Sequence, residues 1–254
     1  MTKVSVITVA LNSAKTIAET VQSIAWQTHI DIEYIVIDGL STDGTMNILR
    51  SLESHIDILA SERDGGIYDA MNKGIKKANG EVIVFLNADD IMLPRGIELA
   101  VAAMDANDLD FYFGGTLFSG GLVSGYRPHR LYLGLDYIAS AHSGSFFVRR
   151  KVHDEIGLYD GKFKTSADYD FFLRMISRGY VGGGARANEI TSVFRPGGFS
   201  SKQRYSDKKI QEILIRKNNG QSLFKITIFL FASVPPQLFM RTLRFIAKLI
   251  LRSA

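Results

Sequence analysis

The first hundred residues alternate between short apolar runs and segments whose apolar residues recur every three or four positions. The runs predict strands at Val4–Val9, Glu33–Asp38, Ile56–Ala60 and Val82–Leu86. The segments between them predict helices over Lys15–Trp26, Met46–Glu53 and Ile67–Ala78. Strands that alternate with helices in this way predict a mostly parallel sheet with right-handed crossovers and helices on both faces.

The fourth run, Val82–Leu86, has five apolar residues in a row and predicts a strand buried on both faces. It ends abruptly at Asn87-Ala88-Asp89-Asp90. Ligands of open α/β sheets bind at the carboxyl ends of strands, and two adjacent carboxylates repel each other unless a cation lies beside them. A divalent cation that carries substrate phosphates is the natural occupant. The plainer alternative is a turn with two solvated acids.

The pattern after Pro94 is less regular and predicts a mixture of elements. They are a helix over Gly96–Met104, a strand over Asp110–Phe118, a hairpin or flexible loop over Ser119–Tyr126, a strand over Gly144–Arg149, a helix over Ser166–Arg178 and a strand over Glu189–Phe194. Trp26 extends the apolar stripe of the first helix, which favours a place in the core over a functional role.

The C-terminal segment, residues 202–254, differs in kind from the body, residues 1–201. It holds 11 Lys and Arg against 2 Asp and Glu, whereas the body has a balance of −5. A helix is expected over Tyr205–Lys217, followed by the strongly apolar stretch Leu223–Val234. Beyond Gln237, basic residues form one stripe beside a wide apolar face, as in helices that lie in a membrane interface. The alternative is a terminal helix packed on the body.

Composition excludes several classes of protein. The chain has 254 residues and no cysteine, which rules out disulfides and thiolate metal sites and fits a reducing compartment. The N-terminus lacks the apolar run of a signal peptide, and no ordinary membrane span is expected because no stretch of 18 residues is uninterruptedly apolar.

Acidic residues stand at or just beyond several of the predicted strand ends: Asp38, Asp64 and the pair Asp89–Asp90. In a parallel sheet these acids lie along one edge, where they repel each other unless some accept hydrogen bonds and others bind a metal. A nucleoside diphosphate with its cation meets both needs.

Three segments together, VSVITVALNSAKTI, EYIVIDGLSTDGT and GEVIVFLNADD, resemble the family 2 glycosyltransferases with the GT-A fold. The resemblance covers about residues 3–200 and is closest to bacterial enzymes that build exopolysaccharide, O-antigen or colanic-acid-type glycans. Each motif is weakly specific, but their order and spacing are highly specific. The resemblance implies an α/β GT-A fold that binds a nucleotide-sugar donor, and the C-terminal helical tail follows it.

The resemblance also implies roles for single residues in the donor site. Asp38 takes the place of the aspartate that hydrogen-bonds the nucleobase, usually uracil, in a pocket lined by Val9 and Asn12. Asp64 and Asn72 are expected to shape the nucleotide site.

Asn87-Ala88-Asp89 matches the family's DxD element, with Asp89 as the ligand of Mg²⁺ or Mn²⁺ on the diphosphate. Asn87 replaces the first acid of that element. Its amide can still accept a hydrogen bond from a ribose hydroxyl, but the site loses one negative charge.

Ser166-Ala167-Asp168 matches the family segment that carries the catalytic base, with Ala167 in place of the usual Glu. Asp168 is then the base that takes a proton from the acceptor hydroxyl in a single, inverting displacement. The alternative is an acid that only stabilises a helix N-terminus. His142 is a possible acceptor or phosphate contact, although a lone histidine is more often structural.

These inferences describe an inverting, cation-dependent glycosyltransferase that uses a UDP-sugar and a glycan or polyprenyl-diphosphate-linked acceptor at the cytoplasmic face of a bacterial inner membrane. Two alternatives remain: a nucleotidyltransferase, although the turn after the first strand lacks that class's glycines, and a non-catalytic nucleotide-sugar-binding module. A nucleic-acid partner is not expected, because the basic residues of the tail alternate with large apolar ones.

Overall fold

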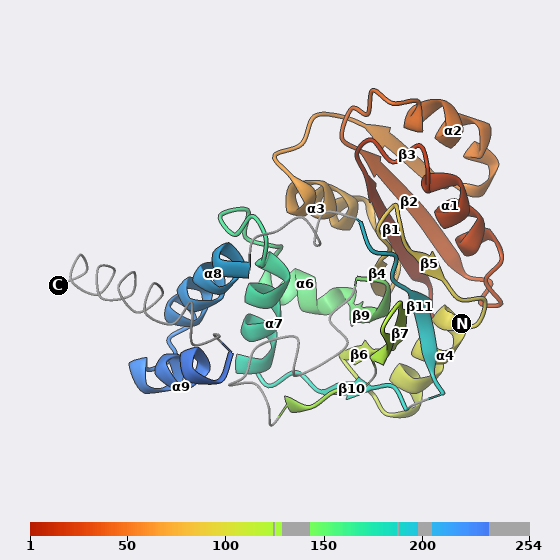
Figure 1. Cartoon of the computed structure of the whole chain (residues 1–254). Coiled ribbons are helices and arrows are strands. Elements are labelled where there is room, and N and C mark those ends of the chain that lie inside the picture. Colours follow the sequence, from red (N-terminus) through yellow and green to blue (C-terminus); the bar gives the residue numbers. More distant parts are fainter. Residues whose placement is uncertain (124, 129–142, 187, 198–204, 234–254) are drawn as a thin grey trace.

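A computed structural model describes residues 1–123, 125–128, 143–186, 188–197 and 205–233 of the chain (Figure 1). The larger of its two sheets has seven strands. In spatial order they are β10 (Gly182–Gly184), β6 (Phe111–Phe113), β9 (Phe146–Arg149), β4 (Val82–Phe85), β1 (Val4–Ala10), β2 (Ile32–Asp38) and β3 (Ile58–Ser61). Only β9 among these runs antiparallel to its neighbours, so the predicted mostly parallel sheet is confirmed.

Helices cover both faces of this sheet. One face carries α1 (Ile17–Ala25), α2 (Thr45–Ser51) and α4 (Gly96–Ala106), and the other carries α3 (Ile67–Lys77), α6 (Arg150–Ile156) and α7 (Ala167–Ser177). Short 3₁₀ turns occupy Glu53–His55 and Ser143–Ser145. Each face has its own apolar core.

Side-chain alternation explains why the strands are apolar throughout. In β2, Tyr34 and Val36 enter the core under α1 and α2, whereas Ile35 and Ile37 enter the core under α3. Successive side chains of a strand point to opposite faces, so a strand covered on both sides needs apolar residues at every position.

The predicted strand Asp110–Phe118 is in fact two strands in different sheets. It breaks at Gly114, between β6 and β7 (Gly115–Phe118). A Cβ at Gly114 would lie 2.3 Å from Thr191 Cγ2, so the backbone passes too close to the next strand for any side chain. β7 then joins a second, four-stranded sheet in the order β5 (Ile91–Met92), β11 (Ile190–Val193), β7 and β8 (Gly121–Val123). β7 and β8 form a hairpin, but only its turn and its second strand lie within the segment 119–126 for which a hairpin or flexible loop was predicted.

Sequence pattern did not predict β5, β10 or α6. β10 is a run of three glycines, and a Cβ at Gly182 would lie 2.0 Å from the Phe111 ring. The aromatic ring of the neighbouring strand therefore occupies the space of a side chain. No alternation of apolar and polar residues marks such a strand.

Trp26 was expected in the core, and this prediction is wrong: its side chain is 67% exposed. The helix α1 ends at Ala25, with Ile17, Val21 and Ile24 facing the sheet. A position two residues beyond Ile24 is turned by about 200° from it, to the side away from the sheet.

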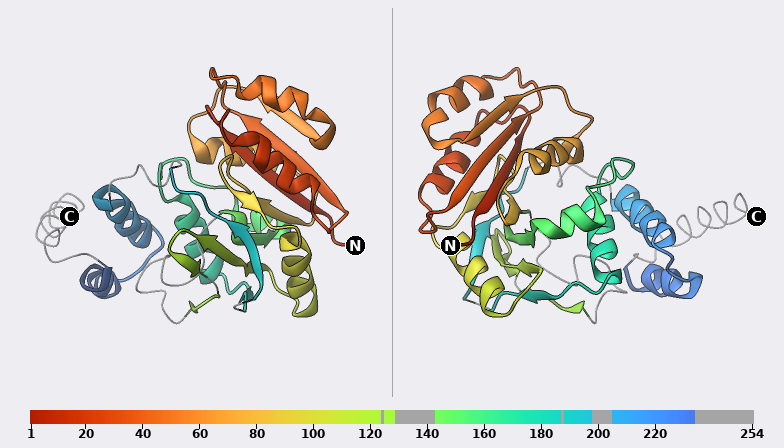
Figure 2. Two further views of the ribbon diagram at one scale, coloured as in Figure 1. Left: turned by 45° about the vertical axis from the view of Figure 1, so that its right-hand side comes forward. Right: turned by 180° about the vertical axis from the view of Figure 1, so that it is seen from behind.

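Two further helices lie away from β2 and β3: α8 (Tyr205–Asn218) packs beside α7, and α9 (Leu223–Ser233) packs on α8 (Figures 1 and 2). Ile215 of α8 belongs to the core under α7, and Asn219 Nδ2 donates to Asp170 Oδ1 of α7 at 2.9 Å. A third cluster (Ile213, Ile226, Phe229, Leu230) joins α9 to α8. No helix within the described ranges is long and apolar enough to cross a membrane. The basic stripe expected beyond Gln237 lies outside the described residues.

Candidate active site at the carboxyl edge of the sheet

Parallel pairing brings the predicted donor residues to one edge. Ala10 at the end of β1 is in register with Asp38 at the end of β2, and Asp38 is in register with Ser61 at the end of β3. β4 runs parallel to β1 on its other side, so Asn87 begins the loop at the same edge. The expectation that these strand ends lie together is confirmed by this topology.

Asp38 is buried, and its carboxylate is held by its neighbours. Ser61 Oγ donates to Oδ2 at 2.7 Å, and the backbone N–H of Ser41 donates to the same oxygen at 3.1 Å. A carboxylate has about four acceptor sites, so these two bonds leave capacity for another donor such as a base N–H.

The two loops in front of Asp38 have an unusual backbone. Asn12 has φ +51° and Leu40 has φ +64°, in the left-handed region that residues other than glycine rarely adopt. Asn12 Oδ1 accepts the N–H of Thr42 at 2.9 Å, which fastens the two loops together. The side chains of Leu11 and Leu40 stay exposed at the edge. Large apolar residues held in strained loops mark this edge as a candidate binding surface.

Asp64 lies against the end of β2. A Cβ on Gly39 would come within 2.4 Å of Asp64 Oδ2. The Asp64 carboxylate can occupy this position only because residue 39 has no side chain. The other oxygen, Oδ1, accepts the N–H of Gly66 at 2.9 Å, just before α3 begins. Asp64 therefore joins the Asp38 loop to the start of α3.

Asn87, Asp89 and Asp90 differ sharply in their surroundings. Asp90 is buried, accepts the N–H of Arg195 at 3.0 Å, and receives Asn87 Nδ2 at 3.3 Å. Burial, with a contribution from the Asp89 charge, raises the pKa of Asp90 to about 7. Asp89 is half-buried, and its carbonyl accepts a hydrogen bond from Arg195 Nε. Asp90 thus holds the turn, and Asp89 is the more exposed acid.

Ala88 points away from these polar groups. Its side chain lies in the core under α1, and its carbonyl accepts hydrogen bonds from Thr16 Oγ1 at 2.8 Å and Thr20 Oγ1 at 3.1 Å. Ala88 therefore attaches the turn to α1 through its backbone and offers no side-chain ligand. Val9, also predicted to line the donor pocket, is half-buried at the end of β1 and packs on the α3 side of the sheet.

The turn offers oxygen ligands for a divalent cation. Asn87 Oδ1 is buried and has no hydrogen-bond partner among the described residues. An orphaned buried oxygen two residues from the Asp89 carboxylate suits Mg²⁺ or Mn²⁺, which usually bind one or two protein oxygens and complete their shell with phosphates and water. The described residues contain no cluster of three or more His, Asp or Glu side chains able to hold a metal. A cation here would depend on the diphosphate of the donor for the rest of its ligands.

Asp168 lies in the first turn of α7 and is half-buried. Its Oδ1 accepts the hydroxyl of Tyr68, on α3, at 3.0 Å. Ala167, which replaces the family's usual Glu, is fully buried in the core. The substitution therefore places a methyl group in packed apolar surroundings, and Asp168 is the acid that this turn presents beside α3.

Asn72 was expected to shape the nucleotide site, and the structure shows its amide on the backbone of Tyr159. Nδ2 donates to the Tyr159 carbonyl at 2.9 Å, and Oδ1 accepts the Tyr159 N–H at 3.0 Å. This paired bond ties α3 to the segment that leads into α7. His142 lies outside the described residues.

Contacts connect the predicted donor and base residues in a series. Asp38 neighbours Gly39, Gly39 touches Asp64, Asp64 caps the turn before α3, and Tyr68 of α3 bonds Asp168. Asp89 joins them through the shared sheet edge. Sequence reasoning missed Tyr68 and Arg195, because a tyrosine on an apolar helix face and an arginine after a strand carry no signal by themselves.

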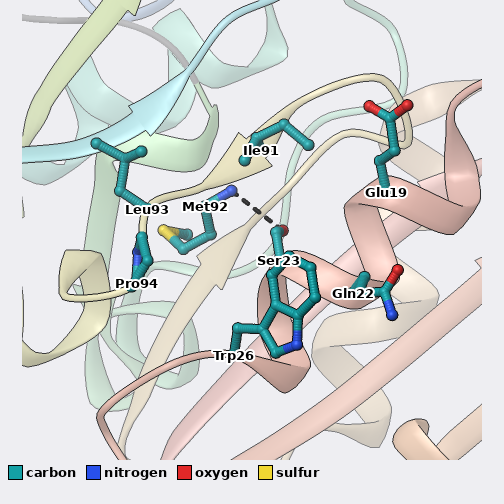
Figure 3. A pocket seen from close by; sticks show the side chains of 8 residues that line it. All are labelled: Glu19, Gln22, Ser23, Trp26, Ile91, Met92, Leu93 and Pro94. Atoms are coloured by element: carbon teal, nitrogen blue, oxygen red, sulfur yellow. Dashed lines mark hydrogen bonds between the residues drawn. The ribbon is translucent and has the colours of Figure 1, made fainter.

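A pocket lies between α1 and the segment Ile91–Pro94 (Figure 3). It measures about 350 Å³ and is lined by Glu19, Gln22, Ser23, Trp26, Ile91, Met92, Leu93 and Pro94. Its walls are largely apolar, and Ser23 Oγ is taken by the N–H of Met92 at 3.2 Å. Glu19, the one acid in its lining, is paired with Arg195, so we assign this pocket no chemistry.

Comparisons with known proteins agree with this arrangement. Residues 5–181 match the family model described as Glycosyl transferase family 2. A PGL/p-HBAD biosynthesis glycosyltransferase of Mycobacterium bovis is 32% identical over 183 residues, which are 68% of this chain and 69% of that protein. The Escherichia coli UDP-Glc:alpha-D-GlcNAc-diphosphoundecaprenol beta-1,3-glucosyltransferase WfgD is 33% identical over 112 residues, or 44% of each chain.

Solved structures show the same fold at low sequence identity. S. aureus TarS 1–349 in complex with UDP-GlcNAc has a TM-score of 0.69 and 19% identity, and the match covers 91% of this chain and 71% of that one. The Pyrobaculum calidifontis mannosyltransferase PcManGT, in complex with GDP-Man and Mn²⁺, has a TM-score of 0.64 and 20% identity and covers 91% and 68% of the two chains. The fold is thus the expected GT-A fold, and with more than half of its length matched by the family model, the chain belongs to glycosyl transferase family 2 and is a glycosyltransferase.

Proposed function

We propose that this glycosyltransferase moves a sugar from a UDP-sugar to an acceptor hydroxyl with inversion at the anomeric carbon. The observation that carries the proposal is the contact series from Asp38 through Asp64 and Tyr68 to Asp168. It links Asp38, the proposed nucleobase acceptor, to Asp168, the proposed base, although the two residues are 130 positions apart in the chain.

The nucleobase of the donor binds at the sheet edge, between the two loops that follow β1 and β2. Leu11 and Leu40 supply exposed apolar surface for its faces, and Asp38 accepts its N–H. Uracil has such an N–H between two carbonyls. The choice of UDP is supported by the printed ligands of structural neighbours, UDP-GlcNAc for TarS and UDP for a mycobacterial glucosyl-3-phosphoglycerate synthase.

The diphosphate lies at the turn after β4. Asp89 and Asn87 Oδ1 would hold Mg²⁺ or Mn²⁺ there, which supplies positive charge for the departing diphosphate. Two neighbours of the same fold were solved with Mn²⁺ or Mg²⁺, which supports this choice of cation. Arg195 keeps the turn in place by bonding the Asp89 carbonyl and the Asp90 carboxylate.

Asp168 acts as the general base. It takes the proton of the acceptor hydroxyl as that oxygen attacks the anomeric carbon and the bond to the diphosphate breaks on the opposite face. One displacement of this kind inverts the anomeric configuration, and it needs one carboxylate and not two. The buried Ala167 beside Asp168 is therefore compatible with this reaction, although it provides no second carboxylate.

Replacing the base tests this reaction. We expect Asp168→Asn to lower turnover of a UDP-sugar by about a hundredfold or more, the scale of lost general-base catalysis, while UDP binding measured by thermal shift stays unchanged. Asp154→Asn is the matched control, because Asp154 is an exposed acid on α6.

Three outcomes would count against the proposal. Equal turnover in Asp168→Asn and wild type would remove Asp168 from the mechanism. UDP binding without any transfer or hydrolysis would favour a non-catalytic binding module, and nucleotidyl transfer to a sugar phosphate would favour a nucleotidyltransferase.

The acceptor is a glycan or a polyprenyl-diphosphate-linked sugar, met at the cytoplasmic face of the inner membrane. The name of WfgD describes a diphosphoundecaprenol-linked acceptor, which supports the lipid-linked choice. On α9, Leu223, Phe224 and Phe231 are more than half exposed, and the segment 202–254 that contains them carries a charge of +9. Exposed apolar residues within a basic segment favour binding to an anionic lipid surface.

A further inference from the structure

We propose that Tyr68 is a positioning residue for the base: its phenol holds one oxygen of Asp168 and keeps the carboxylate ionised and aimed at the acceptor. The inference rests on the proposed role of Asp168 as the base. It assigns a role in proton transfer to α3, on which the sequence predicted only Asn72 as a functional residue.

Packing around Tyr68 holds its hydrogen bond to Asp168 in place. Tyr68 Oη lies 3.0 Å from Asp168 Oδ1, across 100 residues of sequence. The Tyr68 side chain is only 8% exposed, and its ring lies 5.5 Å from the ring of Tyr159, centroid to centroid. A ring confined in this way cannot swing its hydroxyl away from the carboxylate at low cost.

The segment that carries Asp168 is fixed to α3 at two further points. One helical turn after Tyr68, Asn72 forms its paired bond with the Tyr159 backbone. Before α3, the carbonyl of Gly65 accepts a hydrogen bond from Lys164 Nζ at 3.4 Å. Three contacts therefore keep α3 and the start of α7 in one fixed relation, and Tyr68 is the contact that reaches the base itself.

The chemistry of Tyr68 and Asp168 determines how the hydrogen bond between them affects the ionisation of Asp168. Burial, together with the Asp168 charge, raises the pKa of Tyr68 well above its usual value of 10, so the phenol remains a donor throughout the working pH range. A donor that bonds a carboxylate favours its ionised form. Tyr68 thus makes Asp168 available as a base at lower pH and restricts its rotation.

The test is Tyr68→Phe, which deletes the hydroxyl and keeps the ring against Tyr159. We expect kcat to fall about tenfold or more through loss of orientation, with KM for the UDP-sugar within about twofold of wild type. We expect the acidic limb of the kcat–pH profile to move up by about one unit, because a hydrogen bond to a charged group contributes on that scale.

Tyr180→Phe is the matched control, because it deletes a phenol that donates to another carboxylate, Glu155 Oε2, away from the site. Its profile should coincide with that of wild type. A merely structural role for Tyr68 could lower the amount of folded enzyme but would leave the position of the acidic limb unchanged, and that result would overturn the inference.

A double variant separates this inference from the proposed function. If Tyr68 acts through Asp168, adding Tyr68→Phe to Asp168→Asn should cost less than about twofold beyond the single substitution. A full further loss would show that Tyr68 acts on something else. If Asp168→Asn alone retains activity, the proposed function has lost its base; if it is inactive while Tyr68→Phe matches wild type in rate and profile, only the positioning role fails.

Discussion

At the scale of single residues, surroundings give identical side chains different tasks. Asp89 and Asp90 are adjacent acids, and the sequence motif assigned a role to Asp89 alone, as a metal ligand. Arg195 separates them: its N–H bonds the buried Asp90 carboxylate, while its Nε bonds the carbonyl of Asp89. The position of the acids could be predicted from the strand that precedes them. The contact by which Asp90 holds the turn could not, because Arg195 comes from 105 residues further along the chain.

His153 gives a prediction at this scale. The imidazole is 3% exposed, stacks on Phe171 with centroids 4.3 Å apart, and burial lowers its pKa to about 3. In the unfolded chain it titrates near 6.5. Between these values the unfolded state binds a proton that the folded state does not, so His153 makes the protein less stable as pH falls from about 6.5 towards 3.

We therefore expect His153→Leu, a change of similar volume, to flatten the acid side of the stability curve. The free energy of unfolding of wild type should fall more steeply than that of the variant, by up to about 1.4 kcal/mol per pH unit within this window. Urea titrations at several pH values would measure it. Parallel curves for the two proteins would show that the imidazole is protonated, or solvated, in the folded state.

At the scale of elements, prediction succeeded where hydrophobic pattern decides the structure. β1 to β4 and α1 to α3 lie within a few residues of their predicted bounds, because apolar runs and helical spacing reflect burial directly. Prediction failed where a residue from a distant part of the sequence determines the local structure. The strand at 110–118 divides because Thr191 leaves no room at Gly114, and β10 exists because glycines accommodate Phe111. Neither neighbour is adjacent in sequence.

Gly114 supplies the prediction for this scale. We expect Gly114→Ala to lower the free energy of unfolding by about 1–3 kcal/mol, because the new methyl group would overlap Thr191 at the point where the two sheets meet. Gly161→Ala is the control, since a Cβ there meets no atom within 4 Å and the glycine has no positive φ. Equilibrium unfolding in urea compares the two, and equal stabilities would mean that the sheets move apart easily.

At the scale of the whole molecule, the C-terminal helices are joined to the body more closely than composition suggests. The change in charge near residue 202 marked a boundary in sequence, yet α8 shares the core of α7 and bonds it through Asn219 and Asp170. Charge pattern reports what a surface meets, whereas packing decides what folds together. The exposed residues of α9 thus sit on a helix pair anchored to the helix that carries Asp168.

Lipid binding is the prediction for this scale. Phe224, 73% exposed on α9, should enter the interface, so Phe224→Glu should weaken cosedimentation with vesicles containing anionic lipid by about tenfold. Ile30→Glu alters an apolar residue of the body that is also highly exposed, at 82%, and this variant should bind as wild type does. Neutral vesicles and high salt should reduce binding of all three proteins. If Phe224→Glu sediments as wild type, α9 is not the lipid-binding face.

The close approach of Gly39 to Asp64 has a practical consequence for anyone who redesigns this enzyme. A bulkier residue at 39 displaces Asp64, which lies just before the N-terminus of α3. Tyr68 of α3 in turn donates a hydrogen bond to Asp168. Under the roles proposed above for Asp38 and Asp168, efforts to change which nucleotide is accepted would then disturb reactivity as well. Libraries that seek new donors should vary the two loops that carry Leu11 and Leu40 and leave glycine at 39, so that selectivity can be altered while reactivity is retained.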